Sequence, residues 1–295
     1  MEEGLWPTNP PFLPDSIRSL EDAVLWYRHQ FDRPNENTAN ECNHPSNPNT
    51  LRGEVSPNYS VHPMAPERVY ALIPDVKLIL LLRDPISRAK SSFNMKWQIE
   101  VCGDKAWTRA DCFTLVNRTR QELADDWQRQ AVREFQKEMA RLRGCFPDSK
   151  DDQSDDSSGY QKCLGLREMS SVELHLFLDD AFHLGRGLYA EQLMQWFKFF
   201  SPSQFLILSS EEFERDPEST LKRSTKFLGL DSSLLDTSVL NYRHHVRDYV
   251  FQGDLGDINA MLRDFYRPHN ERLFRLLESH GHAYAVNDLK KHFVT

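Results

Sequence analysis

Residues 76–93, VKLILLLRDPISRAKSSF, constrain the fold more than any other stretch of the chain. Six of the seven residues from Val76 to Leu82 are apolar. This run is too short for a membrane span and predicts a strand buried on both faces of a parallel sheet. Asp84 is a good N-cap and Pro85 suits the first helical position, so we expect a helix directly after the strand.

Arg83 stands at the junction of this strand and helix. A cation is disfavoured at the positive end of a helix dipole unless an anion joins it. An anion among Arg83, the first helical N–H groups and the serines Ser87 and Ser91 would complete the site, and phosphate fits best. Such a charge-assisted contact contributes about 1.5–3 kcal/mol. The alternative is a surface ion pair between Arg83 and a carboxylate such as Asp84.

Helical and strand patterns alternate along the rest of the chain. Helices are expected at about 66–72, 121–142, 187–200 and 217–229, with further helices at the C-terminus, and an apolar strand is expected at 204–210. Helices between short apolar strands predict an α/β layered fold with a mostly parallel sheet. Ligands bind such sheets at the carboxyl ends of the strands, where Arg83 lies.

The stretch LLLRDPISRAKSSF resembles the 3′-phosphate-binding segment of sulfotransferases that use 3′-phosphoadenosine 5′-phosphosulfate (PAPS), where a serine follows the arginine by eight positions. Three further segments resemble the carbohydrate, Golgi-type (heparan-sulfate-sulfotransferase-like) branch of that family, in the family's order. They are the strand GEVSPNYS at 53–60, the helix, strand and helix at 187–230, and the helices from 262 to 277. The resemblance implies a P-loop-like three-layer fold, a central mostly parallel sheet flanked by helices, with Arg83 and Ser91 on the 3′-phosphate.

One part of the family pattern is missing. The family's N-terminal strand leads into a loop of the Lys-x-Gly-Thr-Thr kind that holds the 5′-phosphosulfate, and this sequence contains no such loop. The glycine pair of GRG at 185–187 lacks the lysine and the threonines and is interpreted as a turn before the next helix. Two explanations stay open: the chain starts downstream of the missing strand and loop, or it is a natural variant with a damaged donor site.

The resemblance also implies roles outside the arginine segment. Carbohydrate sulfotransferases use a glutamate shortly after the donor loop as catalytic base, and Glu3 is the candidate, with a solvated terminus as the alternative. Glu54 and Ser56 would lie on the strand that lines the acceptor cleft, although strand-end hydrogen bonding would explain them equally well. Arg247, or its neighbour Arg243, could replace the family's basic loop over the adenosine and 3′-phosphate.

Five cysteines without a CxxC pair make a zinc site unexpected. Cys145 and Cys163 flank an acidic, serine-rich stretch with too little apolar content to pack, and either a disulfide closes this loop or both thiols stay free. Of two glycosylation sequons, Asn117 is the expected acceptor, because Asn58 falls on the expected strand near the site.

Two regions are expected along the chain. Residues 1–50, rich in proline and asparagine, would be an irregular segment that docks on a sulfotransferase domain at 51–295, with 146–163 as an acidic flexible loop. Neither a signal peptide nor a membrane helix is visible, so a membrane link is expected only through an anchor that this chain does not contain. The resemblance itself implies the Golgi lumen.

The resemblance implies transfer of a sulfuryl group from PAPS, a co-substrate that needs no metal, to a hydroxyl or amine of a carbohydrate or proteoglycan acceptor. The alternative is a non-catalytic relative that binds nucleotide or glycan. A net charge of −8 argues against a nucleic-acid partner but leaves room for a local basic cleft. A P-loop kinase is disfavoured, since the sequence has no Gly-x-x-x-x-Gly-Lys-Ser/Thr run.

Overall fold

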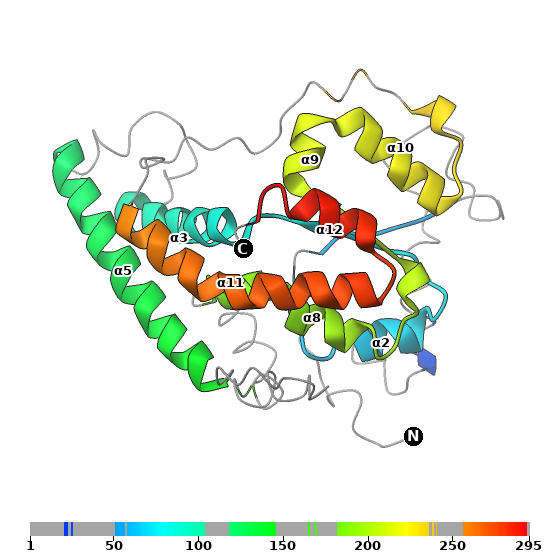
Figure 1. Ribbon diagram of the computed structural model, residues 1–295, viewed down its shortest axis with the longest axis horizontal. Helices are drawn as coiled ribbons and strands as arrows, with labels where there is room; N and C mark the ends of the chain where they lie inside the picture. Colours follow the sequence, from blue (N-terminus) through cyan, green and yellow to red (C-terminus); the bar gives the residue numbers. More distant parts are fainter. Residues whose placement is uncertain are drawn as a thin grey trace.

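A computed structural model describes residues 51–56, 58–103, 118–145, 182–235 and 256–293, together with a few single positions. In this part helices surround a two-stranded parallel sheet, so the predicted α/β class is confirmed (Figure 1). The elements are α2 (Ala65–Leu72), β1 (Leu78–Leu82), α3 (Pro85–Cys102), α5 (Arg120–Cys145), the 3-10 turn η3 (Gly185–Gly187), α8 (Tyr189–Trp196), η4 (Pro202–Gln204), β2 (Phe205–Ser209), α9 (Ser210–Arg215), α10 (Pro217–Leu228), η5 (Ser232–Leu234), α11 (Gly256–Ser279) and α12 (Ala283–Leu289).

β1 and β2 pair in parallel although they lie far apart in the sequence. Leu78 is the partner of Phe205 at one end of the pair, and Leu82 is the partner of Ser209 at the other. Both strands therefore end at the same edge of the sheet. Each then leads into a helix, α3 after β1 and α9 after β2.

Two hydrophobic cores hold the helices together, and α11 belongs to both. Its first half packs with α3, α5 and the residues before α8. Its second half packs with the strands, α8 and α12. Pro268 lies inside α11 between the two halves. In Figure 1, α11 crosses the front of the molecule between α12 and α8, and α5 lies along the left side.

Local sequence signals predicted these helices well. Asp84 caps α3 by accepting a hydrogen bond from the Ser87 N–H at 2.8 Å, with Pro85 in the first turn. The apolar stripe of α5 is buried as expected, although the helix extends over Arg120–Cys145. α10 ends at Gly229, whose φ of 79° is in the left-handed region that glycine adopts readily.

The prediction that β1 is buried on both faces is wrong. Ile79 and Leu81 are 43% and 50% exposed, whereas Leu82 is buried. β2, in contrast, is buried along its whole length. Both strands are aliphatic, so the sequence predicts strands at these positions but does not reveal that one of them is covered on a single face.

The strand expected at 53–60 is also absent. Residues 51–56 have no regular secondary structure, residues 58–61 form turns, and Val55 is 95% exposed. A strand needs a neighbour that pairs with its backbone groups, and the sheet that the structure describes consists of β1 and β2. The segment instead joins the core through Val61, which is buried.

Candidate active site

Arg83 lies at the carboxyl edge of the sheet with its backbone fixed and its side chain exposed. Its carbonyl oxygen accepts a hydrogen bond from the Tyr189 hydroxyl at 2.8 Å. Burial raises the pKa of Tyr189 to about 12, so this hydroxyl keeps its proton at neutral pH. Arg83 as a whole is exposed to solvent. This arrangement suits an arginine that binds a soluble anion, since the backbone is held from inside the protein.

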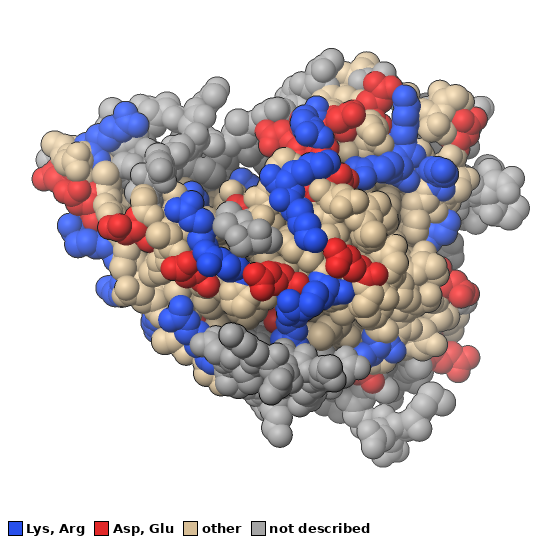
Figure 2. Space-filling view, viewed as in Figure 1, with Lys and Arg blue, Asp and Glu red and all other residues tan. Residues whose placement is uncertain are grey.

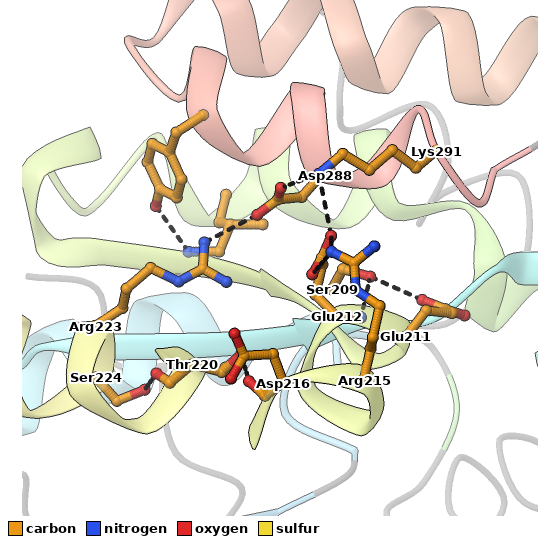
Figure 3. Close-up of polar contacts among 12 residues, drawn as sticks. Ser209, Glu211, Glu212, Arg215, Asp216, Thr220, Arg223, Ser224, Asp288 and Lys291 are labelled. Atoms are coloured by element: carbon orange, nitrogen blue, oxygen red, sulfur yellow. Dashed lines mark hydrogen bonds and ion pairs between the residues drawn. The ribbon is translucent and has the colours of Figure 1, made fainter. Parts of the chain in front are cut away.

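The Glu211 carboxylate links the ends of both strands. Its Oε1 accepts the backbone N–H of Asp84 at 2.8 Å. Its Oε2 accepts the Ser209 hydroxyl at 2.9 Å, a contact drawn in Figure 3. Ser209 Oγ in turn accepts the N–H of Glu212 at 3.3 Å and so caps α9. One side chain therefore joins the turn after β1 to the turn after β2.

Carboxylates accept hydrogen bonds from backbone N–H groups at the start of α3. Glu211 accepts the N–H of Asp84, and the Asp84 carboxylate accepts the N–H of Ser87. Burial raises the pKa of Asp84, and the neighbouring Glu211 carboxylate acts in the same direction. The expectation that an anion contacts the first N–H groups of this helix is therefore wrong for these two residues.

The GRG turn η3 packs against the start of α3. An added Cβ at Gly187 would lie 2.9 Å from Pro85 Cβ. The turn precedes α8, as predicted, but its closeness to the site was missed. The repeated glycine is the signal that could have revealed it, because glycine lets another chain segment come this close.

A buried carboxylate supports the same turn. Glu138 of α5 accepts the N–H groups of Leu184 and Gly185, both at 2.9 Å. Burial raises the pKa of Glu138 to about 7, although these hydrogen bonds and the charge of Arg88 act in the opposite direction. Glu138 therefore anchors the backbone before α8 with a side chain that titrates near neutral pH.

The buried His183 lies near positive charges of α3 and the GRG turn. Burial lowers its pKa to about 3, and the positive charges of Lys96, Arg88 and Arg186 lower it further. Its Nδ1 lies 2.9 Å from Ser92 Oγ. The imidazole is neutral at physiological pH, and three cations lie close enough to act on it, despite the chain's net charge of −8.

Ion pairs join α9, α10 and α12 beside the strand ends (Figure 3). Lys291 contacts Glu212 at 3.1 Å and Asp288 at 2.9 Å. Arg223 contacts Asp288 at 2.9 Å, and Arg215 pairs with Glu212. The Glu212 side chain is only 8% exposed, which sets this network apart from simple surface pairs. The network holds α9, with its strand-linking carboxylate, against the C-terminal helix.

The structure describes only part of the predicted site. Ser91 is partly buried on α3, about two helical turns beyond Arg83. Glu54 is exposed and accepts a hydrogen bond from the Tyr59 hydroxyl at 2.9 Å. Ser56 is partly buried, and neither Glu54 nor Ser56 lies on a strand. The other candidates lie outside the described residues: Glu3, Asn117, Cys163 and Arg247.

Cys145, at the C-terminal end of α5, is disulfide-bonded. The side chains of the other four cysteines lie outside the described part of the chain, so the pairing with Cys163 stays a prediction. Within the described ranges, no helix has an apolar run long enough to cross a bilayer. The same residues contain no group of three or more His, Cys, Asp or Glu side chains placed to hold a metal ion.

Comparison with known proteins identifies the fold family. The family profile described as "Sulfotransferase domain" matches residues 57–253, more than half of the chain. The chain belongs to the sulfotransferase family. The matched range of this sulfotransferase includes Arg83, Ser91 and the GRG turn, and it begins after Glu54 and Ser56.

The sulfotransferase is similar to several curated proteins at low identity. Mouse heparan sulfate glucosamine 3-O-sulfotransferase 3B1 is 24% identical over 88% of this chain and 53% of its own length. The membrane-associated sulfotransferase kil1 of Dictyostelium discoideum is 24% identical over 77% of this chain and 52% of its own length. Rat carbohydrate sulfotransferase 15 is 24% identical over 74% of this chain and 33% of its own length. The chain thus spans about half the length, or less, of these relatives.

Among solved structures, a sulfotransferase from Alicyclobacillus acidocaldarius is similar over 75% of this chain and 62% of that one. The TM-score is 0.43 and the identity is 19%. The family assignment does not depend on this likeness.

Proposed function

We propose that this sulfotransferase transfers a sulfuryl group from PAPS to a hydroxyl or amine of a carbohydrate acceptor. The observation that carries the proposal is Arg83, exposed at the carboxyl edge of a parallel sheet and within the range that matches the family. The segment around it resembles the family's 3′-phosphate site. Relatives named as heparan sulfate and carbohydrate sulfotransferases support a sugar acceptor.

Arg83 and Ser91 are proposed to hold the 3′-phosphate of the donor. A guanidinium offers paired N–H groups that match two phosphate oxygens, and a serine hydroxyl adds a weaker neutral hydrogen bond. The backbone N–H groups of Asp84 and Ser87 contribute nothing, because carboxylates accept both of them. Discrimination for the 3′-phosphate should therefore depend mainly on one guanidinium.

In-line transfer requires a held donor, a stabilised leaving oxygen and removal of the acceptor proton. When bound, PAPS supplies the sulfuryl group, and the family resemblance implies no metal. Glu3 is proposed as the base and Arg247 as a further donor contact. Glu54 and Ser56 are proposed on the acceptor side, where Tyr59 orients the exposed Glu54 carboxylate.

The Golgi lumen is the proposed compartment. Disulfides persist in the secretory pathway and are rare in the cytosol, and Cys145 is disulfide-bonded. The proposed Cys145–Cys163 bridge and a glycan on Asn117 both fit that compartment. Mass mapping of non-reduced, deglycosylated peptides from secreted protein tests both modifications.

Calorimetry tests the donor half of the proposal. We expect the chain to bind 3′-phosphoadenosine 5′-phosphate (PAP) more tightly than adenosine 5′-phosphate, because only PAP carries the 3′-phosphate. Arg83→Ala should remove most of this preference. Arg133→Ala is the matched control, since Arg133 lies on α5 with its side chain 71% exposed. Equal affinity of the wild-type chain for both nucleotides would contradict the assignment.

A transfer assay tests the acceptor half. Labelled sulfate should move from PAPS onto at least one member of a panel of neutral and acidic polysaccharides. Preferential PAP binding without transfer to any acceptor would instead support a relative that binds nucleotide or glycan without catalysis.

A further inference from the structure

The backbone of the GRG turn η3 is held more firmly than a simple connection requires. Glu138 from α5 accepts the N–H of Gly185 at 2.9 Å, and Gln192 from α8 donates to the carbonyl oxygen of Gly185 at 3.3 Å. Gln192 also donates to the carbonyl oxygen of Arg186 at 3.0 Å. Tyr266 from α11 donates to the carbonyl oxygen of the residue before the turn at 2.9 Å. Three helices thus fix one short turn.

Both glycines of the turn are packed too closely to carry a side chain. A Cβ on Gly185 would lie 1.9 Å from the Phe182 ring. A Cβ on Gly187 would lie 2.9 Å from Pro85 and 3.0 Å from Tyr266. Arg186 is therefore the one position in this turn where a side chain fits. A fixed backbone that presents one long cationic side chain is a common way to position a functional group.

Arg186 lies between the start of α3 and the irregular segment before α2. Its guanidinium donates a hydrogen bond to Asn58 Oδ1, and the side chain is partly exposed. The adjacent Gly187 packs on Pro85, two residues after Arg83. Arg186 is thus close to the proposed donor site through its backbone, while its side chain contacts the segment before α2.

Arg186 belongs to a group of positive charges near the buried His183. Asn58 accepts a hydrogen bond from the guanidinium through its neutral amide oxygen. Arg88 and Lys96 act together with Arg186 on the buried His183, so these positive charges reinforce one another. On the face drawn in Figure 2, by contrast, basic and acidic side chains are interspersed. A broad basic patch on that face therefore does not account for binding of an acidic ligand.

We propose that Arg186 binds an acidic group, carboxylate or sulfate, on the sugar acceptor and so determines acceptor specificity. This inference rests on the proposed sulfotransferase function. The donor's 3′-phosphate is assigned to Arg83 and Ser91, and the Arg186 guanidinium contacts Asn58 of the segment before α2. A guanidinium can bind either anion through two parallel N–H bonds, an interaction that a neutral sugar cannot match.

The test compares wild type, Arg186→Ala and Arg186→Lys with the control Arg133→Ala, which removes the same charge from a distant exposed site. Calorimetry measures binding of a heparan-type oligosaccharide and, separately, of PAP. We expect Arg186→Ala to weaken oligosaccharide binding about 10- to 100-fold. Arg186→Lys should weaken it less, because lysine keeps the charge but loses the paired donors. PAP affinity should stay unchanged in all three variants.

Two modified oligosaccharides separate the sources of the anion. One has its carboxyl groups reduced and the other has its N-sulfates replaced by acetyl groups. The derivative that lacks the recognised group should bind wild type and Arg186→Ala equally. The other derivative should still bind wild type more tightly than Arg186→Ala.

Several results would overturn the inference. They are no oligosaccharide binding by wild type, the same affinity for Arg186→Ala and Arg133→Ala, or a loss of PAP rather than oligosaccharide binding. If Arg186→Ala unfolds at a lower temperature than wild type, the oligosaccharide affinities of Arg186→Lys and Arg133→Lys are compared instead. Equal affinities of these two variants would then overturn the inference. A wild-type chain without preference for PAP would refute the proposed function, whereas PAP preference with no Arg186 effect would refute this inference alone.

Discussion

At the residue scale, Glu138 should couple stability to pH. Its pKa in the folded chain is about 7, against an ordinary value of 4.5. Between these values the unfolded chain releases a proton that the folded chain keeps, so stability falls as pH rises from about 4.5 to 7. Glu138→Gln removes this loss. Its unfolding free energy relative to wild type should therefore rise between pH 5 and pH 8, by up to a few kcal/mol at about 1.4 kcal/mol per pKa unit.

Denaturant titrations at several pH values measure this difference directly. His183, with its pKa lowered to about 3, acts in the opposite sense, because its contribution is lost as pH falls below its ordinary value. Both proteins contain His183, so its effect cancels in the comparison. A difference that stays constant from pH 5 to pH 8 would show that Glu138 does not titrate as described.

A pair of glycine substitutions tests the packing of the turn. Gly185→Ala places a methyl group against the Phe182 ring and should destabilise the protein by roughly 1–3 kcal/mol. Gly144→Ala is the matched control, because Gly144 is helical in α5 and an added Cβ meets nothing within 4 Å. That control should stabilise by up to about 1 kcal/mol. Equal unfolding midpoints for both variants would contradict the packing.

Arg83 could be predicted as a site residue, but most of its surroundings could not. Strand, arginine, aspartate and proline follow one another in the sequence, so their order alone places Arg83 at a sheet edge. The contacts of Arg83 with Tyr189 and of Asp84 with Glu211 join residues 106 and 127 positions apart. No local pattern encodes such contacts, whereas the closeness of the GRG turn to the site had a local signal, the repeated glycine.

At the element scale, two helices start with the same Asp-Pro pair. Asp84 caps α3 and Asp216 caps α10, each by accepting an N–H from the residue three positions later. Replacing either with alanine should cost about 0.5–2 kcal/mol. Asparagine should restore most of the loss at both sites. Asparagine should restore a larger share of the lost stability at position 84 than at position 216, because at 84 it also removes a charge next to Glu211.

Thermal unfolding of the four single variants measures these effects. A larger loss for Asp84→Asn than for Asp84→Ala would contradict the capping role. No difference between the asparagine variants at 84 and 216 would contradict the repulsion between Asp84 and Glu211.

Elements with their own start and stop signals were the predictable ones. The cap of α3, the buried stripe of α5 and the glycine that ends α10 all lie within the segments that they define. The prediction of a strand at 53–60 was wrong because a strand forms only where a neighbouring strand pairs with its backbone. The exposed face of β1 was missed because burial depends on what packs against a strand, and its own residues do not encode that.

At the scale of the whole molecule, α11 should make the two cores unfold as one unit. Leu262 lies in the first core and Leu277 in the second, and both are fully buried. Leu262→Ala and Leu277→Ala should each cost about 2–5 kcal/mol and lower a single shared transition. Arg275→Ala, an exposed site on the same helix, is the control. Tryptophan fluorescence and circular dichroism should give coincident curves, and a variant that shifts only one of them would indicate independent cores.

The long separation of β1 and β2 has a consequence during synthesis. The residues that the strand ends bring together, Asp84 and Glu211, are 127 positions apart. A ribosome that adds roughly 5–20 residues per second needs about 6–25 s to cover that distance. For this time LILLL of β1 lacks β2, its partner strand in the described part of the chain, and an unpaired aliphatic segment readily pairs with other chains. We therefore expect pairing of β1 with other chains during synthesis to lower the yield of soluble protein, and Leu81→Lys, on the exposed face of β1, should raise that yield.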